Sequence, residues 1–410
     1  MPVGIDESGP LILGDEFFQD PYPVYEALRA EGGARQARLP NGHKVWIVAG
    51  YKEARAALSD PRLSKRLSAA EHLFERHFTD PNRRWKYDNS VVEHMLNSDP
   101  PDHSRQRRLV GKAFTTRRVA ALRPRIEQIG AELIDEMARH DEVDLIDSFA
   151  FPLPTTVICE LLGIPEPDRD DFRSWSHTIV SVANANDPRK VQEDSAAMAA
   201  YLGKLLAAKR AHPADDLLTA LVQATDDDDQ LTEVELVSMA FLLLVAGHET
   251  TVNLISNGVL SLLQHPGQRA LLRQDPGLVP NAVEELLRYE GPVNLTTLRY
   301  TKEPMTIGTT TVPEGEFVIV ALSSANRDPR SFAGPDTLDV TRKPGGHVAF
   351  GHGIHYCVGA PLARLEAEVA FGQLVSRFPE MTLATGFDEL AWRHSTLVRG
   401  LTALPVRLRP

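Results

Sequence analysis

The chain has 410 residues, of which 42% are apolar and 24% charged, and its formal net charge is −12 at pH 7. An acidic balance argues against general nucleic-acid binding, because phosphate backbones select for basic surfaces. The two cysteines, Cys159 and Cys357, are too few for an iron–sulfur cluster or a cysteine-rich zinc site, and no C-x-x-C-H segment offers covalent haem attachment.

The sequence favours a cytoplasmic protein with no membrane anchor. Its N-terminus has no basic start followed by an apolar stretch, so no signal peptide is evident. The longest apolar run, residues 239–246, is far shorter than the roughly 20 residues that span a bilayer. The low cysteine count is typical of a reducing compartment.

Helical patterns dominate the chain. In order, we expect helices at 22–31, 51–59, 101–114, 119–139, 154–162, 194–212, 232–265, 281–289 and 361–378. Strand patterns are fewer and lie mostly in the last third, at 44–48, 305–312, 316–322 and 397–408. Two long stretches, 71–98 and 323–349, look irregular, and loops of that length are usually functional.

The length exceeds the usual ceiling for one simple core, which favours two domains or one large domain filled by a cofactor. No internal repeat and no long flexible linker divides the chain. We therefore expect a single domain over residues 1–410, mainly α with a small β region.

The strongest helix signal runs through the middle of the chain. Thr232 and Glu235 form a capping-box pattern at its start, and Pro266 follows its last residue, His265. The span is roughly 50 Å at the standard rise per residue. Residues 239–246 are apolar around nearly the whole circumference, so we expect the middle of this helix to be buried.

Cys357 lies in a loop, residues 350–359, that reads FGHGIHYCVG and leads directly into the helix expected at 361–378. A thiolate at a helix N-terminus is stabilised by free backbone N–H groups and by the local dipole. The glycines of this loop would let the backbone approach a flat ligand closely. Cys159, in contrast, lies in an apolar segment and fits an ordinary buried packing residue.

This loop resembles the haem-binding loop of the cytochrome P450 superfamily, F-x-x-G-x-x-x-C-x-G, and meets every fixed position. The resemblance implies that Cys357 is the proximal iron ligand of a haem b, whose thiolate donates electrons that favour O–O cleavage. It also implies the cytochrome P450 fold, in which the haem is buried between a long central helix and the cysteine loop.

The centre of the long helix reads AGHETT over residues 246–251 and is similar to the family pattern A-G-x-[DE]-T-T. The resemblance implies that Ala246 contacts the haem, that Gly247 leaves room for O2, and that Glu249 and Thr250 relay protons. The alternative is that Thr250 only bonds back to the carbonyl of Ala246 and bends the helix.

Four further residues match family positions that bind the haem propionates. These are His103, Arg107, Arg299 and His355. Arginine suits the role because its guanidinium can bind a carboxylate through two parallel hydrogen bonds. For any one of these residues alone, solvent exposure is the simpler interpretation. Because all four stand at family positions, we favour binding to the cofactor.

The helix at 101–114 also has an outer face. Arg105, Arg108 and Lys112 share it, roughly opposite His103 and Arg107, and form a basic stripe on an acidic chain. We expect this stripe to attract an acidic ferredoxin.

Glu285 and Arg288 form an E-x-x-R pair on one helix face, which alone is weak evidence. The pair resembles the structural E-x-x-R of the family, and Arg342 has the position of its third member. We expect these residues to hold the fold rather than to take part in catalysis.

The function implied is an oxidoreductase: monooxygenation of a bulky, largely apolar substrate by O2. Electrons would come singly from a ferredoxin and its ferredoxin reductase, because no flavin or iron–sulfur domain is evident in these residues. Two other classes are a peroxide-driven peroxygenase and a non-catalytic haem protein. Glu249 and Thr250 argue against both, because peroxygenases of the family typically lack this acid–alcohol pair and a sensor or carrier does not need it.

Three segments, 158–165, 238–258 and 395–400, are similar to actinomycete hydroxylases that tailor macrolides and other polyketides in antibiotic biosynthesis. Related enzymes hydroxylate steroids and secosteroids, so the resemblance does not choose between these substrates. We expect the pocket walls to come from 71–98, 174–184, 242–246, 293–297 and 396–398.

Overall fold

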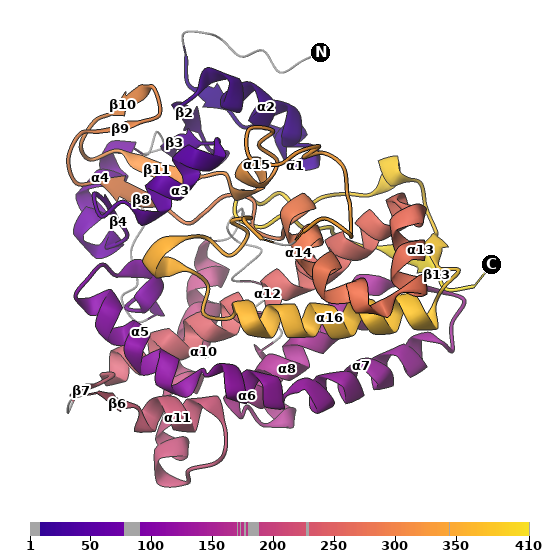
Figure 1. Ribbon diagram of the computed structural model, residues 1–410. Coiled ribbons are helices and arrows are strands. Elements are labelled where there is room, and N and C mark those ends of the chain that lie inside the picture. The colour runs from indigo at the N-terminus through magenta and orange to yellow at the C-terminus, as the bar shows by residue number, and fades with distance from the viewer. Residues whose placement is uncertain are drawn as a thin grey trace.

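The computed structural model describes residues 9–77, 91–169, 171–172, 174–175, 178, 188–226, 229–343 and 345–409. Packed helices make up most of this part of the chain, and a small sheet lies at one side of them (Figure 1). The mainly α architecture with a small β region is therefore confirmed.

Each region expected to be helical contains a helix. The helices are α1 (Asp15–Gln19), α2 (Tyr22–Glu31), α3 (Tyr51–Ser59), α4 (Glu71–His77), α5 (Asp102–Ala113), α6 (Thr116–Ala121), α7 (Arg123–Met137), α8 (Pro152–Leu162), α10 (Pro188–Ala211), α11 (Leu217–Gln223), α12 (Glu233–Gln264), α13 (Pro266–Gln274), α14 (Val279–Tyr289), α15 (Leu322–Asn326) and α16 (Ala360–Arg377).

Several expectations for these elements were wrong in part. The strand expected at 305–312 is a hairpin of two strands, Met305–Ile307 and Thr310–Val312. The stretch 323–349 is not irregular throughout, because α15 covers its first residues. The helix expected at 119–139 is divided between α6 and α7, because Pro124 lacks a backbone N–H and starts a new first turn. The stretch 71–98 is not irregular throughout, since it begins with α4. Of the strand expected at 397–408, only Pro405–Arg407 joins a sheet, while Val398 and Leu401 make isolated bridges to Val293 and Trp392.

The main sheet has six strands in the order β1-β2-β3-β11-β8-β4. Their bounds are β1 (Leu11–Ile12), β2 (Ala34–Arg38), β3 (Lys44–Val48), β11 (Phe317–Val320), β8 (Arg299–Thr301) and β4 (Leu63–Ser64). Strands far apart in the sequence therefore pair: β11 runs parallel to β3, and β8 lies antiparallel between β11 and β4. This pairing joins the N-terminal and C-terminal thirds of the chain.

The remaining strands form small units. They are the hairpin of β9 (Met305–Ile307) and β10 (Thr310–Val312), the hairpin of β6 (Thr225–Asp226) and β7 (Asp229–Gln230), and a three-stranded sheet of β12 (Thr382–Leu383), β13 (Pro405–Arg407) and β5 (Glu142–Asp144).

The long helix α12 packs against α8, α10, α14 and α16 and crosses the middle of the molecule (Figure 1). Both hydrogen bonds of the predicted capping box are present between Thr232 and Glu235, and His265 caps the other end. Within the described residues, α12 is the one helix that is long and apolar enough to cross a membrane, and 67% of its most apolar window is buried inside the fold. Burial among other helices explains its composition.

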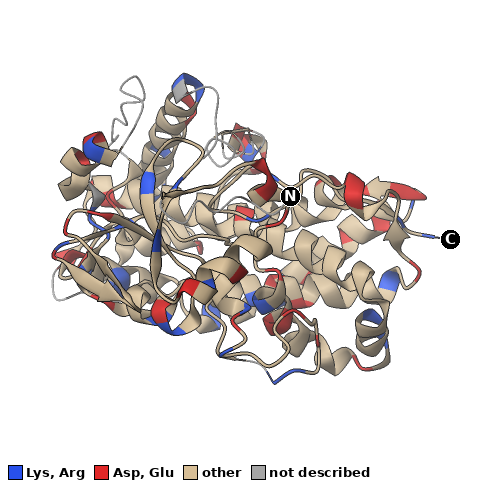
Figure 2. Cartoon of the chain, turned by 90° about the horizontal axis from the view of Figure 1, so that it is seen from above, with Lys and Arg blue, Asp and Glu red and all other residues tan. Residues whose placement is uncertain are grey.

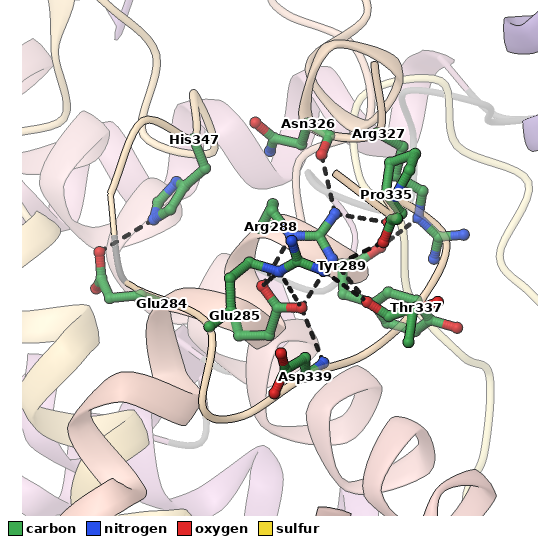
Figure 3. Close-up of polar contacts among 12 residues, drawn as sticks. Glu284, Glu285, Arg288, Tyr289, Asn326, Arg327, Pro335, Thr337, Asp339 and His347 are labelled. Atoms are coloured by element: carbon green, nitrogen blue, oxygen red, sulfur yellow. Dashed lines mark hydrogen bonds and ion pairs between the residues drawn. The ribbon is translucent and has the colours of Figure 1, made fainter. Parts of the chain in front are cut away.

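Glu285 and Arg288 of α14 lie almost fully buried, and the Arg288 guanidinium donates two hydrogen bonds of 2.8 Å to the Glu285 carboxylate (Figure 3). Arg288 also donates to the carbonyls of Asn326, Pro335 and Thr337. Arg342 donates to Glu285 at 3.1 Å and to two more carbonyls of the same loop. This network ties the loop before the cysteine segment to α14, as the fold-holding interpretation requires.

Positions of basic and acidic residues lie interspersed along the helices and loops in Figure 2. Several pair across elements, such as Arg123 of α7 with Glu368 of α16. The acidic residues in this view are therefore distributed among many elements.

Candidate active site

A cavity of about 410 Å³ lies between the middle of α12 and the cysteine loop, residues 350–359. Its remaining walls come from α5, from the segment 292–299 that enters β8, and from Leu397 and Val398. The expected wall segments 242–246, 293–297 and 396–398 all contribute. From 71–98 only Met95 and Leu96 do so among the described residues, and much of 174–184 lies outside them.

The cysteine loop presents its thiol to this cavity. The backbone N–H of Cys357 donates to the carbonyl of Phe350 at 3.0 Å, which closes the loop. Gly351 and Gly353 have φ of 74° and 75°, values that side-chain-bearing residues rarely adopt. The loop then enters α16 through Gly359.

The electrostatic setting of the two cysteines differs. Burial raises the pKa of the Cys357 thiol, but the N–H groups of Gly359 and Ala360 and the guanidinium of Arg107 oppose this rise. These groups are the expected stabilisers of a thiolate at a helix N-terminus. Burial raises the pKa of Cys159 to about 11 without comparable help, so Cys159 behaves as a packing residue.

The polar centre of α12 borders the same cavity through Ala246, Gly247, Glu249 and Thr250. The hydroxyl of Thr250 donates to the carbonyl of Ala246 at 3.0 Å, so the back-bond proposed as the alternative does form. Gly247 packs closely against α8, because a Cβ at this position would lie 3.0 Å from Ile158. The glycine thus allows a close helix contact as well as space in the cavity.

The carboxylate of Glu249 is held by an ion pair with Arg393, and Asn253 donates to it at 3.3 Å. Glu249 is 4% exposed, whereas the side chain of Arg393 is 23% exposed and also donates to the carbonyl of Leu401. No sequence pattern indicated Arg393, because its contact with Glu249 joins residues 144 positions apart.

The four predicted propionate-binding residues all line the cavity. His103 and His355 lie with ring centroids 4.3 Å apart. The structure records no ion pair for Arg107 or Arg299 within the described residues, and Arg299 Nε and both ring nitrogens of His103 lack a hydrogen-bond partner. Burial lowers the pKa of Arg299 to about 10. Burial and the neighbouring cations lower the pKa of His355 to about 2.

Buried cations with unmet hydrogen-bonding capacity are costly unless an anion neutralises them. A planar group with two carboxylates, placed beside a thiol and bounded by apolar walls, satisfies this requirement. The residues present therefore fit a haem.

Two residues at the cavity or next to it were missed. Lys65 borders the cavity and is 1% exposed. Glu366 of α16 is also 1% exposed, and burial, opposed by the nearby Thr251 hydroxyl, raises its pKa well above the usual range. Both types of side chain are normally exposed, so composition alone would place them on the surface.

The basic stripe of α5 is only partly as expected. Arg105 forms ion pairs with Glu235, a member of the α12 capping box, and with Asp229. Arg108 and Lys112 are exposed. Arg105 therefore connects α5 to the start of α12 through an ion pair.

Comparison with known proteins matches residues 177–384 to the family model named Cytochrome P450. The vitamin D(3) 25-hydroxylase of Pseudonocardia autotrophica is 48% identical over 97% of this chain and 96% of its own length. The 6-deoxyerythronolide B hydroxylase of Saccharopolyspora erythraea is 45% identical over 97% of this chain and 98% of its own length. The protein in the solved structure of the tirandamycin C-bound P450 monooxygenase TamI is 53% identical over 98% of this chain and 100% of its own chain. The TM-score of the two structures is 0.89.

Proposed function

We propose that this chain, which belongs to the cytochrome P450 family, inserts one oxygen atom of O2 into a bulky, largely apolar small molecule and releases the other as water. Membership makes it a haem-iron monooxygenase, closely related to hydroxylases that tailor macrolides and polyketides. One observation carries the proposal: the Cys357 thiol and the polar centre of α12 face one cavity that is bordered by buried cations.

Haem b, when bound, would supply the iron at which O2 is activated. Cys357 would hold it through its thiolate, stabilised by the N–H groups that begin α16 and by Arg107. His103, Arg107, Arg299 and His355 would bind the two propionates, and Ala246 would contact the macrocycle. The unmet polar atoms of His103 and Arg299 support this assignment.

Thr250 and Glu249 would handle the protons that the reaction consumes. The Thr250 hydroxyl borders the cavity, where it could hold a proton near the reacting oxygen while it keeps its bond to Ala246. Glu249 lies one residue away, and its ion pair with the partly exposed Arg393 holds its carboxylate beside the cavity. Proton transfer would therefore follow the side of α12 that faces Arg393.

Electrons would arrive singly from a separate ferredoxin, reduced by its own reductase. The two cysteines of these 410 residues cannot bind an iron–sulfur cluster, which usually needs about four ligands. The exposed Arg108 and Lys112 of α5 lie on the same helix as Arg107, so an acidic partner attracted there would approach the cofactor side.

The substrate would be a macrolide or another polyketide, because a relative and a solved structure that name such compounds share 45% and 53% of their residues with this chain. The cavity walls supplied by Leu242, Val293, Leu397 and Val398 are apolar and suit such a molecule. A secosteroid is the second candidate, since a relative at 48% identity is a vitamin D(3) 25-hydroxylase.

The deciding experiment compares turnover with ferredoxin and reductase against turnover with hydrogen peroxide alone. Macrolide and polyketide lactones and secosteroids would first be screened by the haem absorbance change that follows water displacement. We expect ferredoxin-dependent product carrying one atom from 18O2. Product from peroxide alone would favour a peroxygenase, and spectral binding with no product under either condition would favour a non-catalytic haem protein.

A further inference from the structure

We infer that Lys65 binds a haem propionate, as a fifth cationic side chain beside His103, Arg107, Arg299 and His355. The inference rests on the proposed function, because it requires that the cavity hold a haem.

The position of Lys65 follows from strand pairing. Strand β4 pairs antiparallel with β8, with Leu63 opposite Thr301 and Ser64 opposite Tyr300. The next step of this register sets Lys65 opposite Arg299. Opposed residues of an antiparallel pair point to the same face, so Lys65 and Arg299 both border the cavity.

The ammonium group of Lys65 is buried, and no carboxylate of the described residues forms an ion pair with it. The side chain is 1% exposed, and its one recorded hydrogen bond in the described structure goes to the hydroxyl of Thr297. Asp99 is nearby, but its carboxylate accepts from the backbone N–H of Lys65 at 2.9 Å and from the Ser64 hydroxyl. A neutral hydroxyl does not compensate a buried ammonium.

The surroundings of Lys65 add positive charge. Burial and Arg299 lower its pKa well below the usual value, and Asp99 opposes this only in part. His103, Arg107 and His355 border the same cavity as Lys65 and Arg299. Five basic side chains thus meet around one end of the cavity. A dianion at this place would stabilise the charged form of Lys65, and the two propionates of a haem are such a dianion.

The test uses the full chain, reconstituted either with haem b or with haem dimethyl ester, which has no ionised propionates. The rate of haem loss to an excess of apomyoglobin and the reduction potential are measured for the wild type and for Lys65→Met. With haem b, we expect Lys65→Met to lose haem roughly tenfold faster, the size of one charge-assisted hydrogen bond, and to have a more negative potential. With the dimethyl ester, the two proteins should behave alike.

Three variants control for structure. Lys65→Arg keeps a cation and should retain most of the haem affinity. Thr297→Val removes the recorded partner of Lys65 and should leave haem loss nearly unchanged, because the propionate is the essential partner. Lys52→Met removes an exposed lysine of α3 and should have no effect. If Lys65→Met does not fold, the comparison of Lys65→Arg with Lys65→Gln carries the test.

An equal effect of Lys65→Met with both haems, or no effect with haem b, would overturn the inference. A loss of affinity for carboxylated substrates alone would also overturn it, because Lys65 would then bind substrate. These failures differ from failure of the proposed function, in which the wild-type chain would not bind haem through a thiolate.

Discussion

Arg393, in the segment that follows β12, forms an ion pair with Glu249 in the middle of α12. The pair joins a carboxylate that borders the cavity to a guanidinium that reaches the surface. Asn253, one turn after Glu249, donates to both the backbone carbonyl and the side chain of Glu249. The acid of the proposed proton path is therefore fixed from two sides.

Replacing Arg393 should disturb proton supply. In Arg393→Gln, the Glu249 carboxylate keeps only Asn253 and can rotate, so we expect a lower yield of product per O2 and an altered solvent isotope effect. Arg393→Lys should keep most of the wild-type product yield and isotope effect, because lysine keeps the positive charge. The exposed Arg407→Gln is the matched control. Unchanged coupling and isotope effect in Arg393→Gln would show that the ion pair is only structural.

Thr250→Ala should uncouple the reaction. The protein should still consume reductant and O2, but should release much of the oxygen as hydrogen peroxide, since the hydroxyl that holds the proton is gone. Product and peroxide per reductant consumed measure the effect, and Thr250→Ser should stay coupled. Full product yield in the alanine variant would mean that Thr250 serves only the back-bond to Ala246.

Cys357→Ser should abolish the strongly red-shifted absorbance band of the ferrous–carbon monoxide complex, because the thiolate ligand is lost. Cys159→Ser is the matched control and should keep the band, since Cys159 is buried in α8. The reverse result would make Cys159 the ligand.

Arg288→Met should destabilise the fold strongly. It leaves the buried Glu285 carboxylate poorly compensated and removes the donor to three carbonyls, and breaking a buried ion pair costs about 3–5 kcal/mol. Chemical denaturation of the holoprotein measures the loss. The double variant Glu285→Gln/Arg288→Met should lose less than the sum of the single changes. Additive losses would show that the two side chains do not act as a pair.

Arg108→Glu/Lys112→Glu should slow reduction by ferredoxin, and high salt should slow the wild type in the same way, because both weaken long-range attraction. The carbon monoxide spectrum and substrate affinity should not change. Arg139→Glu, two residues after the end of α7, is a control that should leave the rate unchanged. Reduction that is insensitive to salt and to the double reversal would place the ferredoxin elsewhere.

The sequence predicted best what is decided locally. The capping box of α12, the stop at Pro266 and the bounds of α2 and α3 depend on neighbouring residues, and each was predicted to within a residue. The cysteine loop was predictable because its glycines, cysteine and following helix are contiguous. The single domain over 1–410 and the individual site roles stay predictions.

What the sequence could not predict depends on distant contacts. Lys65 is set beside Arg299 by a strand pair more than 200 residues apart, and Arg393 reaches Glu249 across 144 positions. A lysine or arginine in such segments carries no periodic signal and is usually exposed. Glu366 was missed for the same reason, since only the packing of α16 against α12 buries it.

The five basic side chains at the cavity come from four separate stretches: the end of β4, helix α5, the start of β8 and the cysteine loop. A ligand that engages them acts as a cross-link between the two ends of the chain, which β-pairing joins only through short strands. Its binding free energy adds directly to the stability of the fold. Assembly of this protein should therefore follow cofactor supply, and chains made in excess of haem should be the first that proteases remove.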